Sequence, residues 1–300
     1  MEWHAQLQAW GAADEVPSHF GHPHEECDAI ERSGIVAIIG GLSRLRLTGP
    51  DHLGFLQSQV TSDIEALVED GIQLSAWLNP KGQVLALFTV LRDRDGLDLY
   101  LPSQQCDAIA KRLRMFVLRK NVDIASFNAE ELVGLTGAGA RDWLREAGGT
   151  VPSVGHSVRI SDVTVYGLPG YQDRFLARGP TPDLIRFATR AQTTLRLSGT
   201  IAWHAGALMA GVPSITAHTQ ERFIPQMLNL DDLGAVSFDK GCYPGQEIVA
   251  RTQYLGRLKR RLFMARFDAD PSASLPSPLS PALLAPGHSE RIGEVVDVEM

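Results

Sequence analysis

Predicted strands and helices do not alternate strictly along this chain, and their order constrains the fold more than any other feature. A group of strand-like segments comes first, with the turn signal Asn79–Gly82 between two of them, and a helix beginning at Ser103 follows. A strand, a helix with Trp143 and Leu144, two further strands and a helix from Thr181 come next. Hairpins mixed with helices indicate α+β sheets rather than a doubly wound parallel sheet. The strand-like segments are 35–39, 43–47, 73–78, 84–91, 97–101, 131–136, 158–166 and 174–177.

Composition limits the classes of function. The chain has 300 residues, of which 44% are hydrophobic, enough for two or three packed units. Its formal net charge of -7 argues against broad nucleic-acid binding and a DNA partner, although a local basic patch remains open. Three widely spaced cysteines without a CxxC pair suit a reducing cytosol. Since neither a signal peptide nor an apolar run of roughly 20 residues is evident, we expect a cytoplasmic protein without a membrane partner.

The stretch Ser237–Arg251 (SFDKGCYPGQEIVAR) has the most unusual composition. Residues 235–238 read as a short strand, and glycines and a proline then break the chain, while the segment from Gln246 suits either a helix or a strand. If it is a helix, Cys242 lies near its positive end and beside Lys240, and both effects favour the thiolate. The alternative is a small apolar cysteine that fills a gap. The polar, glycine-rich surroundings favour the reactive cysteine.

This stretch also carries a resemblance. The run Lys240–Glu247, followed by Arg251, resembles the signature of the YgfZ-type folate-binding proteins, relatives of the glycine-cleavage T-protein. Segments 223–241, 47–64 and 78–86 extend the likeness, which covers most of residues 35–262. The resemblance implies an aminomethyltransferase-like folate-binding fold around a central cavity. Its expected parts are an N-terminal extension (1–30), a folate-binding region (31–256) with two mixed α+β lobes (about 46–127 and 128–256), and a small C-terminal β-barrel-like unit (257–300), cut short or complete.

The resemblance further implies a tetrahydrofolate-binding protein that supports iron–sulfur cluster assembly or repair and the tRNA-modifying enzymes that depend on it. Its partners would be a reduced folate and iron–sulfur enzymes or assembly proteins. We expect Cys242 to be the functional thiol and Lys240 to hold it as a thiolate. Asp63, in the segment Thr61–Asp63, would lie near the ligand cavity, or else cap the next segment. We also expect ligand contacts from Tyr243, which would stack on a ring, and from Gln246. Glu247 and Arg251 would hold the ligand or fix the geometry of the motif. Gly241 and Gly245 would allow the chain to bend there.

Departures from the T-protein pattern argue against a true aminomethyltransferase. The T-protein's catalytic aspartate follows an asparagine that 101–109 (LPSQQCDAI) lacks, so Asp107 is a doubtful match. Segment 166–175 does not clearly match the glutamate of the pterin segment, and Met209 replaces an acidic residue. A folate-dependent C1 transferase and a non-catalytic docking module for iron–sulfur enzymes remain the alternatives. Three distant cysteines do not suffice for a bound cluster, so an iron–sulfur role would act through a partner.

Three further segments carry weaker signals. The cationic run 255–262 reads as a strand with Arg257, Lys259 and Arg261 on one face, either a solvated edge or a site for a polyglutamate, an RNA or a protein. The group His19, His22, His24 and Cys27 matches no zinc spacing, so we predict no metal site there. The proline-rich segment 268–287 reads as a loop before a strand over 292–298.

Overall fold

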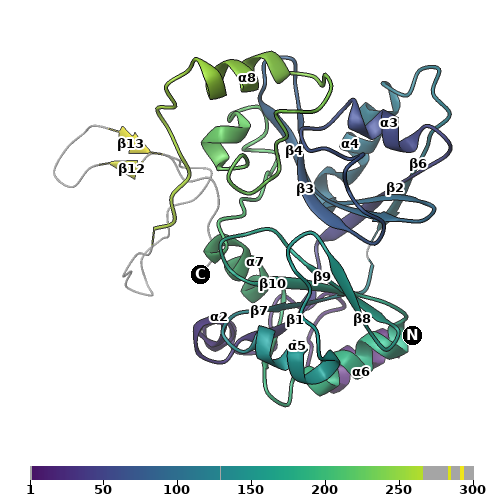
Figure 1. Cartoon of the computed structure of the whole chain (residues 1–300). Helices are drawn as coiled ribbons and strands as arrows, with labels where there is room; N and C mark the ends of the chain where they lie inside the picture. Colours follow the sequence, from purple (N-terminus) through teal and green to yellow (C-terminus); the bar gives the residue numbers. More distant parts are fainter. Residues whose placement is uncertain (1, 129, 266–282, 285–290, 294–300) are drawn as a thin grey trace.

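The computed structural model describes residues 2–128, 130–265, 283–284 and 291–293. Its first lobe is a five-stranded antiparallel sheet in the order β3-β4-β5-β2-β6 (Figure 1). The strands are β2 (Leu42–Thr48), β3 (Ile72–Leu78), β4 (Val84–Asp93), β5 (Gly96–Pro102) and β6 (Asp123–Asn128). Helices α3 (His52–Gln57) and α4 (Ser103–Arg114) cover one face.

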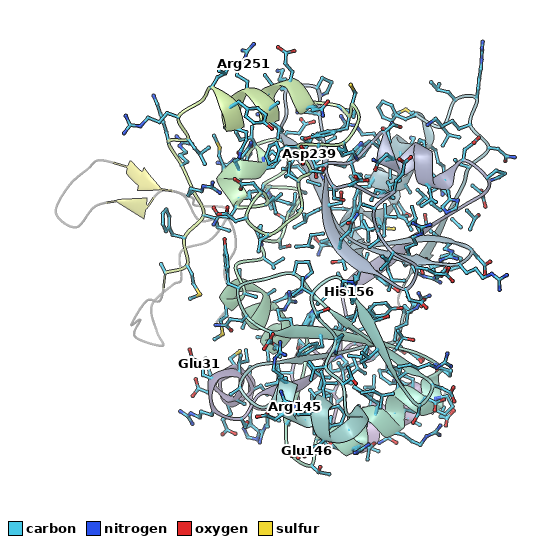
Figure 2. All side chains as sticks on the ribbon, viewed as in Figure 1. Glu31, Arg145, Glu146, His156, Asp239 and Arg251 are labelled. Carbon is cyan, nitrogen blue, oxygen red and sulfur yellow. The ribbon has the colours of Figure 1, made fainter. Side chains whose placement is uncertain are left out.

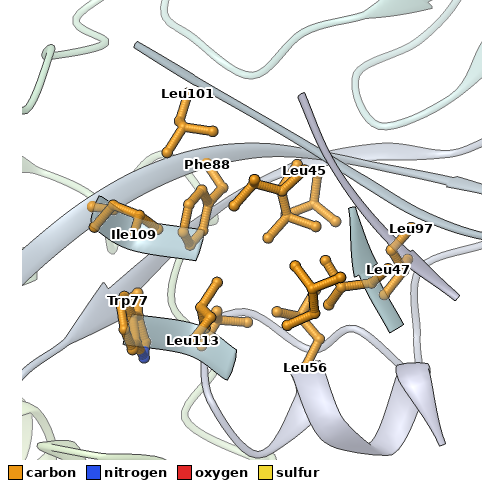
Figure 3. Packing of buried hydrophobic residues seen from close by; sticks show 14 of the residues in the cluster. Leu45, Leu47, Leu56, Trp77, Phe88, Leu97, Leu101, Ile109 and Leu113 are labelled. Carbon is orange, nitrogen blue, oxygen red and sulfur yellow. The ribbon is translucent and has the colours of Figure 1, made fainter. Parts of the chain in front are cut away.

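The core of this lobe follows directly from the sequence pattern. Alternate residues of β2, including Leu45 and Leu47, are fully buried, because successive side chains of a strand point to opposite faces. Cys106, Ile109 and Leu113 recur at helical spacing along α4 and meet them (Figure 3). This apolar contact fixes α3 and α4 on the sheet.

The second lobe is a six-stranded sheet in the order β11-β1-β7-β10-β9-β8. The strands are β1 (Ile35–Ile39), β7 (Leu132–Thr136), β8 (Ser157–Ile160), β9 (Val163–Gly167), β10 (Arg174–Arg178) and β11 (Arg196–Ser198). All its pairs are antiparallel except β1 with β11. Five helices pack on it: α1 (Glu2–Ala9), α2 (Pro23–Arg32), α5 (Ala140–Gly148), α6 (Thr181–Ala191) and α7 (Thr200–Met209).

The N-terminal residues form part of this second lobe. Leu7 of α1 and Ile30 of α2 are each 1% exposed and belong to apolar clusters on the two faces of the sheet. Because β1 pairs with β7 and β11, the chain begins in the second lobe, builds the first lobe with residues 42–128 and then returns. The predicted division into an extension over 1–30 and lobes at 46–127 and 128–256 therefore differs from this arrangement, since long-range strand pairing is invisible in local pattern.

Segment 212–255 covers the other face of the first sheet. Its apolar side chains, such as Phe223 and Leu230, pack on Leu74 and Val84 of β3 and β4. Apart from the 3-10 turn η1 (Pro225–Leu228) and helix α8 (Gln246–Tyr254), it is irregular. The structure thus selects the helix for the segment after Gln246. The short strand predicted at 235–238 is absent, because its backbone groups bond singly to Leu230 and Thr61 rather than to a ladder of a neighbouring strand.

A group of opposite charges joins the two lobes. Asp98 of β5 has a fully buried side chain and lies within 3.2 Å of three guanidinium groups: Arg44 and Arg46 of β2, and Arg178 of β10. Arg178 also bonds to Glu130, in the link between the lobes, at 3.2 Å. A buried carboxylate is tolerated only when it is paired in this way. The network therefore ties β10 of the second lobe to the first sheet.

Some expected elements are shorter than predicted or fall outside the described residues. The helical spacing of Leu53, Leu56 and Val60 predicts a helix that reaches Val60, but α3 ends at Gln57, and Val60 instead forms a bridge with Trp77. Residues 255–262 form no strand. The expected C-terminal unit lies largely outside the described residues, which include only β12 (Leu283–Leu284) and β13 (Arg291–Gly293). Within the described chain, every helix is too short or too polar to cross a membrane.

Candidate functional site

The loop before α8 carries the signature residues. Gly245 has φ +79, and a Cβ there would come within 2.6 Å of the Asn79 carbonyl oxygen and 2.7 Å of Gly82, so only glycine fits this close approach. Gly241, in contrast, has an ordinary backbone conformation and open space around its Cα. The structure therefore requires glycine at Gly245, as predicted for a bend of the motif. It shows no such requirement at Gly241.

Lys240 is buried, with 9% of its surface exposed. Its Nζ donates to the carbonyl oxygens of Gln57 at 2.6 Å, Val60 at 2.8 Å and Ser62 at 2.7 Å. An ammonium group has three donors, and all three are used. The prediction that Lys240 holds the thiolate of Cys242 is therefore wrong: its side chain points into the protein and fastens the loop after α3.

Burial has an electrostatic consequence at Lys240. Removal from water lowers its pKa to about 8, with nearby Asp63 and Glu65 acting in the opposite direction. The three carbonyl oxygens stabilise the charged form, and the ring of Tyr243 lies 5.4 Å from the ammonium. The buried cation is thus compensated by dipoles rather than by a carboxylate.

Cys242 is exposed, and it differs in this from the other two cysteines. Cys106 lies 1% exposed in the core of the first lobe, where burial raises the pKa of its thiol. Cys27 is half-buried. Because reagents and partner proteins reach only exposed sulfur atoms, Cys242 is the thiol best placed for chemistry.

The remaining signature side chains divide between core and solvent. Tyr243 is 6% exposed and packs in the cluster under segment 212–255, so the prediction that it stacks on a ligand ring is wrong. Glu247 and Arg251 are exposed on α8 and pair with each other at 3.2 Å. Figure 2 shows Arg251 at the outer surface of this helix. Gln246 reaches only the carbonyl oxygen of Gly241, at 3.5 Å. The ligand or motif role expected for Glu247 and Arg251 stays a prediction, since both side chains are exposed on α8.

An open cleft of about 370 Å³ lies where the first lobe, the second lobe and segment 212–255 meet. Asp63 and Gln73 line it from the first lobe, and Ser237 lines it from the signature segment. His156, labelled in Figure 2, lines it from the second lobe. Apolar side chains complete the wall: Ala66, Leu67, Val68 and Ile72. The sequence indicated only Asp63. Gln73 and His156 lie on a strand and a loop without any motif, and Ser237 begins the signature stretch but had no predicted role. Only the chain's return between lobes brings the three together.

Asp63 caps a turn, as one of the two interpretations of Thr61–Asp63 predicted, and it also lines the cleft. Its Oδ1 accepts hydrogen bonds from Gln57 Nε2 at 3.0 Å and from the N–H groups of Glu65 and Ala66. Within the described residues Oδ2 has no hydrogen-bond partner. One carboxylate oxygen therefore fixes the loop, and the other remains for a ligand.

One loop connects this cleft to the signature segment. The hydroxyl of Thr61 donates to the carbonyl of Ala235 at 2.6 Å, and Ser237 N–H donates to the carbonyl of Thr61 at 2.9 Å. Lys240 adds its three bonds to the same loop. Cys242 is not among the residues that line the cleft. The cysteine and the cleft instead share a common, tightly bonded support.

Other predicted candidates have local roles. Arg261 of the cationic run pairs with Asp231 at 2.7 Å and with Asp232 at 3.3 Å. Asp107 is exposed on α4, next to the buried Cys106. Across the ranges that the structure describes, no three His, Cys, Asp or Glu side chains converge as metal ligands. His19 instead accepts a hydrogen bond from the N–H of Gly21.

The fold of this chain matches that of a solved structure. The two mixed lobes define an aminomethyltransferase fold: the crystal structure of glycine cleavage system aminomethyltransferase T from Bartonella henselae superposes with a TM-score of 0.67. That match covers 84% of this chain and 74% of the other at 16% identity, so it shows the fold alone. The predicted α+β class and aminomethyltransferase-like fold are confirmed.

Sequence relatives identify the family. The tRNA-modifying protein YgfZ of Colwellia psychrerythraea is 32% identical over 222 residues, 73% of this chain and 67% of the relative. That of Yersinia pseudotuberculosis is 33% identical over 220 residues, 72% of this chain and 66% of the relative. The chain therefore belongs to the YgfZ family, with a match that spans about two thirds of these relatives' own length. No protein-family model matches it.

Proposed function

We propose that this protein binds tetrahydrofolate, or another reduced folate, and supports iron–sulfur cluster assembly or repair and the tRNA-modifying enzymes that depend on it. Family membership supports the link to tRNA modification, since the curated relatives are named tRNA-modifying proteins. The observation that carries the folate proposal is the cleft at the meeting point of the lobes, with a carboxylate oxygen free at its wall. Its volume lies within the usual range for small-molecule sites, about 300–1,000 Å³.

The cleft residues fit a reduced pterin. A pterin ring presents amino and N–H donors on one edge and flat apolar faces. Asp63 Oδ2 accepts from the donor edge, and Leu67 and Ile72 offer apolar contact to the faces. Gln73 and Ser237 add further hydrogen-bonding groups. Reduced folate, when bound, would supply the one-carbon chemistry.

Cys242 serves in this proposal as the functional thiol toward an iron–sulfur partner. Its exposure leaves it open to a partner surface, while the loop that it shares with the cleft is fastened through Lys240. Binding in the cleft and presentation of the thiol thus depend on one support. With one exposed thiol, the chain acts on a partner's cluster rather than holding its own.

Calorimetric titration with tetrahydrofolate tests the folate proposal. We expect saturable binding by wild type and about tenfold weaker binding by Asp63→Asn, which loses one charged acceptor worth about 1.4 kcal/mol. Glu65→Gln is the matched control, because Glu65 is exposed and does not line the cleft. A flat wild-type titration would refute the proposal.

A second experiment tests the thiol. Cys242→Ala should fold normally and bind tetrahydrofolate as wild type does, but fail to restore iron–sulfur enzyme activity in a strain that lacks the protein. Cys27→Ala, at the half-buried cysteine, is the control. Full restoration by Cys242→Ala would show that the sulfur is dispensable.

A further inference from the structure

Arg174 is a buried cation whose counter-charge is missing from the described chain. It begins β10, only 6% of its surface is exposed, and its Nε is fully buried without a hydrogen-bond partner. Among the described residues its guanidinium forms no ion pair and no hydrogen bond, and the guanidinium carbon lies 4.2 Å from the centre of the Trp203 ring. Asp173, the adjacent residue, is bound to Arg141 instead.

Such an arrangement is unfavourable unless something else binds there. A guanidinium carries five N–H donors, and a buried charge without a partner destabilises a fold by several kcal/mol. Stacking on an aromatic ring recovers only part of this cost, because the ring accepts none of the N–H donors in the plane of the guanidinium. Burial lowers the pKa of Arg174 to about 9, so the group keeps its charge at neutral pH. Orphaned buried donors of this kind mark the place of a ligand or ordered water.

The surroundings of Arg174 are built to hold it. Trp203 of α7 lies directly over Gly134 of β7, where a Cβ would come within 2.5 Å of the indole ring. Gly206 lets the same helix approach Thr136, the residue paired with Arg174 across the sheet. The absence of side chains at Gly134 and Gly206 thus lets α7 pack closely on the sheet and holds the Trp203 indole in one position. The guanidinium of Arg174 stacks on this indole.

The chemistry of this platform selects the class of ligand. Among the residues that the structure describes, no charged side chain pairs with Arg174, and its neighbour Asp173 bonds to Arg141. One positive charge matches one negative charge, and a guanidinium binds a carboxylate through two parallel hydrogen bonds. Arg174 is not among the residues that line the cleft with Asp63, so this position is distinct from that cleft.

We propose that Arg174, seated on Trp203, binds the carboxylate of a small-molecule ligand. This inference goes beyond folate binding in the cleft. Two sources supply the same chemistry: a carboxylate of the folate itself, or a free amino acid such as glutamate. The indole fixes the plane of the guanidinium, and the incoming carboxylate provides the acceptors that the described chain lacks.

The test compares wild type with Arg174→Met, which keeps side-chain length and removes the charge. Three probes are titrated by calorimetry and thermal denaturation: tetrahydrofolate, 6-methyltetrahydropterin, which has no carboxylate, and L-glutamate. The matched control is Arg190→Met, because Arg190 also lies over a tryptophan, Trp143 at 6.0 Å, but is exposed. Arg174→Lys keeps the charge and loses the paired donors, and should bind with intermediate affinity.

If the carboxylate belongs to folate, wild type binds tetrahydrofolate at least about tenfold more tightly than the pterin, and Arg174→Met binds both alike. If it belongs to a free acid, L-glutamate raises the denaturation midpoint of wild type and of Arg190→Met but not of Arg174→Met. In either case ligand-free Arg174→Met should melt at a higher temperature than wild type, which a merely structural arginine would not produce.

Three results would overturn the proposal: identical responses of wild type and Arg174→Met to all three probes, no response of wild type to any probe, or a lower melting temperature of ligand-free Arg174→Met. The two proposals fail separately. Tetrahydrofolate binding that survives in Arg174→Met and weakens in Asp63→Asn keeps the folate proposal and removes this one. A glutamate response without folate binding does the reverse.

Discussion

Two buried cations of this protein have opposite surroundings. Lys240 donates to three carbonyl oxygens of a single loop, so its burial is fully compensated. Arg174 lies on Trp203 with no acceptor in the described chain. A compensated buried charge holds structure together, whereas an uncompensated one weakens it and is retained for binding. The comparison assigns Lys240 to support of the signature loop and Arg174 to a ligand.

A second comparison lies within one strand. Arg174 and Arg178 are four residues apart on β10, and both are largely buried. Burial alone would lower the pKa of Arg178, but surrounding groups, including Glu130 and Asp98, raise it above its ordinary value. At Arg174 burial acts alone. Equal substitutions at these two positions should therefore change stability in opposite directions.

The largest expected effect is at Lys240. Lys240→Met removes the ammonium and leaves three carbonyl oxygens without their donor, which should lower the free energy of unfolding by about 3–5 kcal/mol. Urea denaturation at pH 7 measures it. Lys120→Met is the control, because exposed Lys120 donates to a single carbonyl, that of Gly54, and should change stability by under about 0.5 kcal/mol. Equal effects of the two substitutions would break the comparison.

Arg178→Met should follow, with a loss of about 3 kcal/mol, since it removes one of three guanidinium partners from the buried carboxylate of Asp98. Because Arg178 joins the lobes, its loss should also spread urea unfolding into two resolved transitions. A wild-type denaturation curve for this variant would mean that apolar contact alone holds the lobes together.

Arg174→Met should change stability with the opposite sign. Removal of a buried charge that has no partner should raise the free energy of unfolding of the ligand-free protein by about 1–2 kcal/mol, after the lost contact with Trp203 is subtracted. The measurement is the same urea series. A loss of stability similar to that of Arg178→Met would place the missing acceptor within the protein itself.

The smallest effect concerns Asp173, which prefers Arg141 to its neighbour Arg174. The hydrogen bonds from Arg141 lower the pKa of Asp173 below its ordinary value of 3.8. The stability of this half-exposed pair is therefore present above about pH 5 and lost as the pH falls through the lowered pKa. Asp173→Asn should cost under about 1 kcal/mol at pH 7 and nothing near pH 2. A difference that persists in acid would contradict the pairing.

Local pattern predicted much of the fold because the relevant contacts are local. Strand 84–91 and the stripe of Cys106 and Leu113 on α4 follow from periodicities of 2 and 3.6 residues, which directly set the buried face. The short strand at 235–238 was wrong, because apolar alternation there reflects packing of an irregular segment on the first sheet. The place of β1 depends on pairing with β7, about 100 residues away, which no local signal records.

Local pattern likewise predicted some features of the candidate site and missed others. A glycine-rich, polar run around Cys242 indicated a reactive cysteine rather than a core one, and the sulfur is exposed. Lys240 and Tyr243, in the same run, turn inward because a loop of the first lobe supplies carbonyl oxygens to one and apolar neighbours surround the other. Nothing in the sequence marks a lysine whose partners lie some 180 residues away.

The sequence by itself determined the family, the α+β class and an exposed cysteine, since each is written in local composition or in a contiguous motif. Only the tertiary structure decided which cations are compensated and which residues line the cleft. The physical reason is that burial and charge pairing depend on groups that the folded chain brings together from distant positions, and a linear pattern carries no information about that meeting.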